Sequence, residues 1–252
     1  MTAPIAVVTG AAKRIGRAIA EDLARNGWAV AVHYHRSRGA ADELAASIRA
    51  GGGRAAAIGA DLADLAAVAT ILPQTEAALG RPVLLVNNAS IFEDDRVGSL
   101  DAALWQRQMT INLAAPVFLA EAFARGLPEG AEGNVINLID ERVWRPTPRH
   151  FSYQISKSAL WTATQVLAQA LAPRIRVNAI APGPALPSAE QAAEGFRKLT
   201  ESMPLRRGPE LAEFGQTVRY LVENRSITGQ MIGLDGGQHL AWKTPDVAAL
   251  EK

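Results

Sequence analysis

The feature that most constrains this sequence is a regular alternation of short apolar runs with longer amphipathic segments. The apolar runs are almost continuously hydrophobic, which is typical of strands buried on both faces of a parallel sheet. They fall at residues 5–9, 28–34, 55–60, 83–87, 134–139, 175–180 and 231–234. The segments between them carry apolar residues at helical spacing, for example Ile15, Ile19 and Leu23. Because right-handed crossovers connect parallel strands, the pattern predicts an α/β fold, a three-layer doubly wound sandwich of about seven parallel strands.

The bulk composition indicates one domain with a substantial core. The 252 residues fit on a single open sheet, and 48% hydrophobic against 20% charged residues provides ample apolar surface to bury. The chain shows no internal repeat and no low-complexity tract. We therefore expect a single domain over residues 1–252.

Other features of the composition exclude several classes of function. The chain lacks cysteine, which excludes disulfide bonds, thiolate metal sites and a cysteine nucleophile, and agrees with a reducing compartment. Its start lacks the basic and apolar regions of a signal peptide, and no apolar run approaches the roughly 18 residues that a membrane span needs. The net charge of +1 is too near neutral to suggest nucleic acid as the main partner. We expect a soluble cytoplasmic protein that binds neither membrane nor nucleic acid, and we assign no metal site.

A glycine-containing turn follows the first strand directly. Residues 9–16 read Thr-Gly-Ala-Ala-Lys-Arg-Ile-Gly, and an amphipathic helix begins at once. The backbone of such a turn, as in a Rossmann-type domain, can approach a pyrophosphate at the helix N-terminus. A turn without any ligand is the alternative. The residues that we assign to the nucleotide site here are Gly10, Lys13, Arg14, Ile15 and Gly16.

The end of the second strand indicates which nucleotide is bound. In NAD-binding units an acidic residue about 20 positions after the turn accepts hydrogen bonds from the ribose hydroxyls. Here that neighbourhood reads Tyr34, His35, Arg36 and Ser37. A guanidinium and a hydroxyl can bind a 2′-phosphate that a carboxylate would repel, so these residues favour NADPH over NADH. The alternative for Arg36 is a solvated helix start, and to His35 we assign no chemistry.

Further candidates follow the third and fourth strands, at the edge where open α/β sheets bind ligands. Asp61 and Leu62 come after the third strand, and we expect Asp61 to contact adenine. Asn87, Asn88 and Ala89 come at the end of the fourth. We add Asp61, Leu62, Asn88 and Ala89 to the cofactor site.

A tyrosine and a lysine provide the candidate catalytic pair. Tyr153 and Lys157 lie four residues apart in a helical segment and therefore share one face. An ammonium about 4 Å from the phenol would lower its pKa from about 10 by up to about three units. Tyr153 could then donate a proton beside the atom that accepts hydride, while Lys157 tunes the phenol and holds the nicotinamide ribose. The spacing also occurs by chance in many helices, so its weight depends on the upstream turn.

Together these motifs resemble the short-chain dehydrogenase/reductase family from end to end. The matching residues are the 9–16 turn, Asp61, 87–89, Asn112, Tyr153, Lys157, Pro182, Gly183 and 235–237. The resemblance implies that Asn112 helps to hold a proton-relay water and belongs to the catalytic set. It also implies that Pro182 and Gly183 line the nicotinamide and contribute to the cofactor site.

Two residues depart from the general pattern of that family. Arg14 stands where the middle glycine of the turn is usual, and Asp140 replaces a serine thirteen residues before the tyrosine. An ionised aspartate can only accept hydrogen bonds, so Asp140 suits a substrate that offers N–H groups better than a simple ketone. Pterins fit, because they present amino and ring N–H donors and take hydride at a carbon and a proton at the adjacent nitrogen. Phe92 could stack on such a ring, with ordinary core packing as its alternative.

With these residues the sequence looks like the pteridine reductases within the family. The resemblance implies NADPH-dependent reduction of dihydropterins, and possible activity on oxidised pterins or dihydrofolate, with the proton supplied by the Asp140/Tyr153 pair. It implies that Arg14 and Ser90 contact both the cofactor phosphate and the pterin. It also implies a homotetramer, which agrees with small and apolar residues on several faces of the helical segments 102–125 and 151–172. The substrate site that we expect comprises Arg14, Ser90, Phe92, Asp140 and Tyr153.

Two segments near the expected site have their own interpretations. Three prolines within 182–188 precede a helix-compatible stretch, so a substrate-covering lid is predicted at about 184–204. Arg142, Arg145, Arg149 and His150 lie between Asp140 and Tyr153 and could attract an anionic tail such as the folate glutamate; a solvated basic loop is the alternative.

Two rival functions stay open at this point. One is a short-chain reductase that acts on a 3-oxoacyl, sugar or xenobiotic carbonyl and tolerates Asp140. The other is a non-catalytic NADPH-binding regulatory protein, against which the complete set of Asn112, Tyr153 and Lys157 argues.

Overall fold

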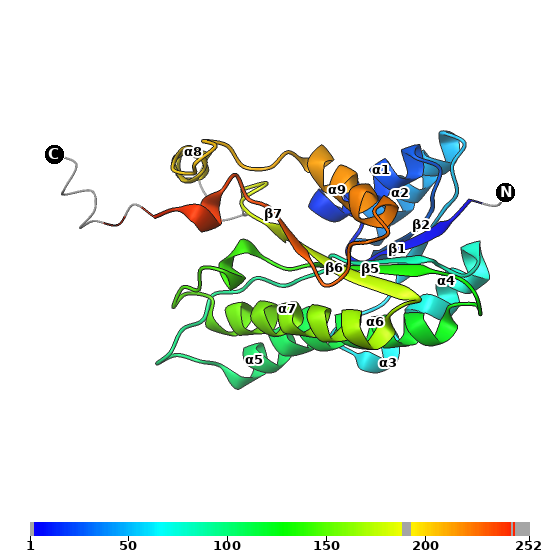
Figure 1. Cartoon of the computed structure of the whole chain (residues 1–252), viewed down its shortest axis with the longest axis horizontal. Coiled ribbons are helices and arrows are strands. Elements are labelled where there is room, and N and C mark those ends of the chain that lie inside the picture. Colours follow the sequence, from blue (N-terminus) through cyan, green and yellow to red (C-terminus); the bar gives the residue numbers. More distant parts are fainter. Residues whose placement is uncertain (1–2, 188–192, 243, 245–252) are drawn as a thin grey trace.

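Seven parallel strands form one twisted sheet at the centre of the molecule (Figure 1). The computed structural model describes residues 3–187, 193–242 and 244. The strand order is β3-β2-β1-β4-β5-β6-β7, and every neighbouring pair is parallel. The predicted α/β doubly wound sheet of about seven strands is therefore confirmed. The strands are β1 Ile5–Val8, β2 Ala29–Tyr34, β3 Ala55–Gly59, β4 Leu84–Asn87, β5 Gly133–Leu138, β6 Ile175–Pro182 and β7 Met231–Leu234.

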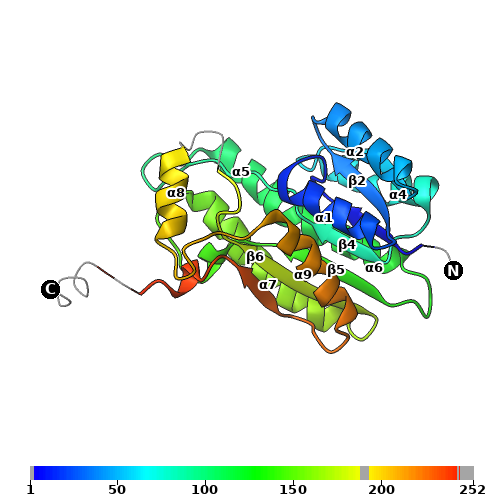
Figure 2. The same ribbon diagram turned by 90° about the horizontal axis from the view of Figure 1, so that it is seen from above.

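Helices cover both faces of the sheet, and alternate strand residues form two separate cores. Val8 packs with Ile19 and Phe214 on one face, whereas Val7 packs with Phe123 on the other. The views from the side and from above place the first group of helices, α1 Arg14–Arg25, α2 Arg38–Ala50 and α9 Leu211–Glu223, together on one face (Figure 1, Figure 2). The opposite face is covered by α3 Leu65–Val68, α4 Ile71–Leu79, α5 Ala102–Met109, α6 Ala115–Gly126 and α7 Phe151–Leu171.

The strand order reverses between β1 and β4. β1 pairs with β2 on one side and with β4 on the other, so the chain leaves the carboxyl ends of β1 and β4 in opposite directions. Open α/β sheets bind ligands in the crevice at this switch point. Val8 and Val86 are register partners, which brings the turn after β1 next to the loop after β4.

The segment predicted as a long helix over 102–125 is interrupted by a wider turn. Helix α5 passes into a five-residue π-helical segment, η1 Thr110–Ala114, before α6 begins. Such segments are rare and are often found at functional sites. This one carries the fully buried side chain of Asn112.

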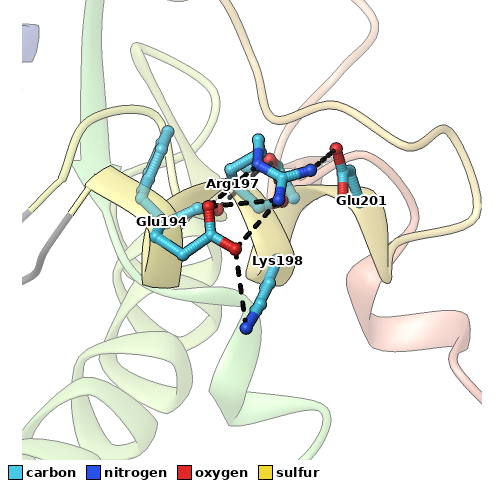
Figure 3. A network of polar contacts seen from close by, with 6 residues as sticks. Glu194, Arg197, Lys198 and Glu201 are labelled. Atoms are coloured by element: carbon cyan, nitrogen blue, oxygen red, sulfur yellow. Dashed lines mark hydrogen bonds and ion pairs between the residues drawn. The ribbon is translucent and has the colours of Figure 1, made fainter.

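The predicted lid region contains a surface helix, α8 Ala193–Glu201, in which no residue is buried. Residues 188–192 of that prediction lie outside the described residues. Arg197 pairs with Glu194 at 2.9 Å and with Glu201 at 2.7 Å, and Lys198 pairs with Glu194 at 3.5 Å (Figure 3). The helix therefore carries its ion pairs in solvent and contributes no fully buried side chain to the core.

Among the residues described, no helix is both long and apolar enough to cross a membrane.

The contrast between the packed core and this polar helix gives a stability prediction. Phe214→Ala removes a fully buried ring and should lower the free energy of unfolding by about 3–5 kcal/mol. Arg197→Gln breaks exposed ion pairs only and should cost less than about 1 kcal/mol. Urea unfolding of both variants measures the two values. An equal loss in the two proteins would contradict the assignment of α8 to a weakly stabilising surface element.

Candidate active site

The turn between β1 and α1 is closed by two glycines at positions where a side chain would clash. Gly10 has a φ of +62°, and its N–H donates a hydrogen bond to His33 Nδ1 at 3.1 Å. A Cβ on Gly16 would lie 2.4 Å from the Gly10 carbonyl oxygen and 2.5 Å from Asn88 Nδ2. The turn therefore packs as tightly as a phosphate-binding backbone requires, and its contact with a nucleotide remains a prediction.

Arg14 takes a backbone conformation that favours glycine. Its φ is +53°, which accounts physically for the glycine usual at this position in the family pattern. Its guanidinium donates hydrogen bonds to the carbonyl oxygens of Pro187 at 3.1 Å and Leu186 at 3.4 Å. The side chain thus reaches from the nucleotide turn to the start of the predicted lid. Of its neighbours, Lys13 is exposed at the helix N-cap and Ile15 packs against the core.

His33 is a site residue to which the sequence analysis assigned no role. It is buried, its Nδ1 accepts from Gly10 N–H, and its Nε2 lies 3.2 Å from the Ala60 carbonyl oxygen, to which it donates. Burial lowers the pKa of His33 to about 4, so the ring stays neutral and keeps this tautomer at neutral pH. A histidine inside the otherwise apolar β2 was the signal that could have identified it.

The residues predicted to favour NADPH over NADH follow β2, and Asp61 and Leu62 follow the neighbouring strand β3. Tyr34 is half-buried against Gly59, and His35 Nε2 lies 3.4 Å from Asp61 Oδ2. Asp61 Oδ1 accepts from Ala63 N–H at 2.9 Å, and the neighbouring Leu62 is buried. Within the described residues, the guanidinium of Arg36, which is exposed, and the hydroxyl of Ser37, which precedes α2, make no hydrogen bond to another side chain. Both groups are therefore accessible to a ligand.

The loop after β4 is tied to the nucleotide turn by hydrogen bonds. Asn88 Nδ2 donates to the Thr9 carbonyl oxygen at 2.8 Å, and Thr9 Oγ1 accepts from the N–H groups of Asn88 and Ala89. Ser90 is exposed, and its hydroxyl donates to Asn112 Oδ1 at 3.1 Å. The sequence therefore predicted correctly that these residues gather at one edge of the sheet.

Asn112 holds this loop from the π-helical segment. Its Oδ1 also accepts from Ile91 N–H at 2.9 Å, while its Nδ2 donates to the Ile91 carbonyl oxygen and to Ser156 Oγ. Both ends of the amide are thus engaged with protein groups. In this structure Asn112 is a positioning residue, and the water-binding role implied by the family resemblance stays a prediction.

Asp140 and Tyr153 are joined by a direct hydrogen bond. Tyr153 Oη donates to Asp140 Oδ2 at 2.8 Å, and Asp140 Oδ1 accepts from Arg142 N–H at 2.9 Å. Lys157 Nζ donates to the Leu138 carbonyl oxygen at 2.7 Å and lies 5.8 Å from the centroid of the Tyr153 ring. Asp140 and Tyr153 meet, with Lys157 one turn further along α7, because β5 ends just before Asp140 and α7 begins just before Tyr153.

The predicted pKa of Tyr153 is wrong in direction. Burial raises the pKa of the phenol well above its ordinary value of 10.0, and the charge and hydrogen bond of Asp140 raise it further. Lys157 does not reverse this shift, since its Nζ donates to the Leu138 carbonyl oxygen and lies 5.8 Å from the centroid of the Tyr153 ring. Burial lowers the pKa of Lys157 itself to about 8. At neutral pH Tyr153 is therefore a protonated donor whose partner is a carboxylate.

Phe92 lines the cleft, so its alternative of ordinary core packing is wrong. The side chain is 44% exposed, and its ring meets the Tyr153 ring edge-on at 4.7 Å between centroids. His150 stacks on Phe92 at 4.0 Å, and Arg142 Cζ lies 5.1 Å from the Phe92 centroid. An aromatic surface is thus available beside the phenol, with His150 already covering part of it.

These groups border a cleft of about 1440 Å³ at the carboxyl edge of the sheet. Its lining includes Pro182 and Gly183. The Gly183 N–H donates to the Leu234 carbonyl oxygen at 2.8 Å. Side chains from the turn, the loop after β4, the segment after β5, α7 and α8 all contribute. Among the predicted site residues, those on the cleft wall are Arg14, Ile15, Asn88, Ser90, Phe92, Asp140, Tyr153, Lys157, Pro182 and Gly183.

Comparison with known proteins identifies relatives that are all described as reductases. A family model described as enoyl-(acyl carrier protein) reductase matches residues 10–239. The crystal structure of FolM alternative dihydrofolate reductase 1 from Brucella canis, complexed with NADP, is 55% identical, covers 98% of each chain and has a TM-score of 0.95. Pteridine reductase 1 of Leishmania tarentolae is 31% identical over 281 residues, covering 95% of this chain and 97% of its own.

A third relative is named for a different substrate. The 3-oxoacyl-[acyl-carrier-protein] reductase of Synechocystis sp. is 32% identical over 241 residues, covering 94% of this chain and 97% of its own. The fold, the Tyr153 and Lys157 pair and these matches lead to one assignment. The chain belongs to the short-chain dehydrogenase/reductase family and is an oxidoreductase of that family.

Proposed function

We propose that the protein is an NADPH-dependent reductase that converts dihydropterins, dihydrofolate among them, to their tetrahydro forms. The observation that carries the proposal is the hydrogen bond from Tyr153 to Asp140, because it pairs a protonated phenol with an acceptor for substrate N–H groups. The similarity to a FolM alternative dihydrofolate reductase and to a pteridine reductase supports the same substrate class.

The residues at the switch point fit NADPH. The closed backbone of Gly10 and Gly16 suits a pyrophosphate, and the accessible Arg36 and Ser37 suit a 2′-phosphate. Lys157 would hold the nicotinamide ribose beside Pro182 and Gly183. NADPH supplies hydride to a carbon of the pterin ring when it is bound.

The protein supplies the proton that the adjacent ring nitrogen takes up. As the C=N double bond becomes a single bond, the hydroxyl proton on Tyr153 Oη moves to that nitrogen. Asp140 keeps oxygen lone pairs free to accept an N–H of the substrate, which orients the ring at the phenol. Phe92 offers a face for stacking, and Ser90 and Arg14 stand on the same wall of the cleft.

The remaining predictions concern the setting of the site. We infer that residues 184–204 cover the bound substrate, since Pro184, Leu186 and Leu199 line the cleft. We infer a homotetramer formed through α6 and α7, where Phe118 and Val166 are exposed apolar side chains. A cytoplasmic location accords with the lack of cysteine.

The rival is reduction of a 3-oxoacyl or other carbonyl substrate, which the Synechocystis relative makes a real alternative. A carbonyl oxygen needs hydrogen-bond donors, and at the position of Asp140 this chain offers only an acceptor. We therefore rank the carbonyl substrates second.

Removing the phenolic hydroxyl tests the proton donor. Tyr153→Phe should lower kcat for dihydropterin reduction by at least about a hundredfold, because the proposed proton donor is lost. NADPH binding, followed by fluorescence, should stay close to that of the native protein. Tyr220→Phe, on the exposed face of α9, is the matched control and should keep full activity. Turnover by Tyr153→Phe at the native rate would exclude the proposed role.

Replacing the acceptor separates the two substrate classes. Asp140→Ser keeps an oxygen that can cap the 3₁₀ turn Glu141–Val143, so the fold should persist. We expect kcat/KM for dihydropterin and dihydrofolate to fall at least about tenfold, since a serine gives up the charge that binds the N–H groups. NADPH oxidation with each pterin and with an acetoacetyl substrate measures the outcome. A native protein that turns over only the carbonyl compound would overturn the pterin assignment.

A buried carboxyl next to Asp140 sets the pH dependence. Glu141 lines the cleft and is 4% exposed. Burial and, to a smaller extent, the charge of Asp140 raise the pKa of Glu141 to about 7, against the opposing charge of Arg142. Its deprotonation adds negative charge near Tyr153 and raises the pKa of the phenol. The phenol is consequently a weaker acid above pH 7.

The rate of dihydropterin reduction should therefore fall several-fold as pH rises from about 6.5 to about 8. Glu141→Gln cannot gain that charge and should keep its rate over the same interval, until the loss of the Lys157 charge near pH 8. Glu129→Gln, an exposed control, should retain the native profile. The account fails if Glu141→Gln leaves the descending limb unchanged.

A further inference from the structure

Three arginines line the cleft on the segment between β5 and α7. Arg142, Arg145 and Arg149 fall within eight residues, and all three line the cleft that contains Phe92 and Tyr153. Arg142 is half-buried at the inner end, against Phe92, whereas Arg145 and Arg149 are exposed. Arg142 therefore lies beside the stacking ring, whereas Arg145 and Arg149 belong to the exposed lining of the cleft.

In the described part of the chain, none of the three guanidinium groups lies within 4 Å of a carboxylate. Arg145 Nη1 makes only a long contact of 3.5 Å with the Gln238 carbonyl oxygen. Two acids that also line the cleft are already engaged: Glu93 pairs with Arg107 at 3.0 Å, and Asp94 with Arg96 at 2.7 Å. The described residues thus leave these three guanidinium groups without a paired carboxylate.

Deeper acids offset this charge in part, because the charges of Arg142 and Arg145 act on the buried Glu141. Asp140 accepts hydrogen bonds from Tyr153 and from Arg142 N–H. His150 stacks on Phe92, and burial together with the charges of Arg142 and Arg149 lowers its pKa. At neutral pH the positive charge at the mouth is therefore supplied by the arginines and not by His150.

We propose that Arg145 and Arg149 form a subsite for the anionic tail of the substrate and make the enzyme prefer pterins with a carboxylate-bearing side chain. The inference rests on the proposed pterin reduction and deepens it. Planar guanidinium forks match carboxylates geometrically, and a glutamate tail offers two carboxylates. If the ring stacks at Phe92, its tail would extend toward the exposed part of the cleft, where Arg145 and Arg149 lie.

The test compares two substrates that share the same dihydropterin ring and differ in the tail. Dihydrofolate carries a p-aminobenzoylglutamate tail, and dihydrobiopterin carries a short uncharged side chain. In the double variant Arg145→Gln with Arg149→Gln, KM for dihydrofolate should rise about tenfold, as expected when charge-assisted hydrogen bonds are lost. Values for dihydrobiopterin should stay within about twofold, because the ring site is untouched. Arg81→Gln, an exposed arginine outside the lining of the cleft, is the control that should change neither.

Binding of the oxidised ligands is measured beside the kinetics and needs no turnover. By calorimetry, folate should bind the native protein with NADP more tightly than 6-methylpterin, and the double variant should lose that advantage. Equal effects of the substitutions on both ligands, or no effect on folate, would overturn the subsite. If the native protein reduces neither pterin, the proposed function fails, and the calorimetric difference alone decides whether the arginines bind the tail.

Discussion

The reversal of strand order between β1 and β4 is the constraint on which the rest of the site depends. It leaves one crevice at the carboxyl edge where the turn after β1, the loop after β4 and the segment after β5 all meet. Hydrogen bonds then fix these loops to each other: His33 holds Gly10, Asn88 holds Thr9, and Asn112 holds Ser90. Residues spread over most of the chain are thereby placed around one cleft.

Within that cleft, Asp140 is the contact that bears most directly on Tyr153 as the proposed proton donor. Burial raises the pKa of the phenol, and the charge and hydrogen bond of Asp140 raise it further, so the phenol keeps its proton and remains a donor. A carboxylate can accept from N–H groups but cannot donate to a carbonyl oxygen. Under the proposed function, one substitution relative to the general family pattern thus bears on both the proton donor and the preferred acceptor, and the similarity to FolM and pteridine reductase supports the same proposal.

Much of this could be predicted from the sequence because it depends on periodicity and on local spacing. Continuous apolar runs identified the strands, and the four-residue spacing of Tyr153 and Lys157 placed both on one face of α7. Asp140 meets Tyr153 as the residue pattern implied, although only the structure shows a direct hydrogen bond.

The features that the sequence did not predict depend on burial and long-range contact. The pKa of Tyr153 follows from desolvation and from the charge and hydrogen bond of Asp140, neither of which spacing encodes. The contact of Arg14 with Leu186 and Pro187 joins residues more than 170 positions apart, and the π-helical turn at Asn112 breaks a helix that the pattern treats as continuous.

A crystal structure of the protein with NADP and a non-reducible pterin analogue tests the central claim most directly. The account predicts the pterin ring between Phe92 and the nicotinamide, with a ring or amino N–H donating to Asp140 and the acceptor nitrogen within hydrogen-bond distance of Tyr153 Oη. A pterin bound elsewhere in the cleft, or turned so that Asp140 faces none of its N–H groups, would contradict it.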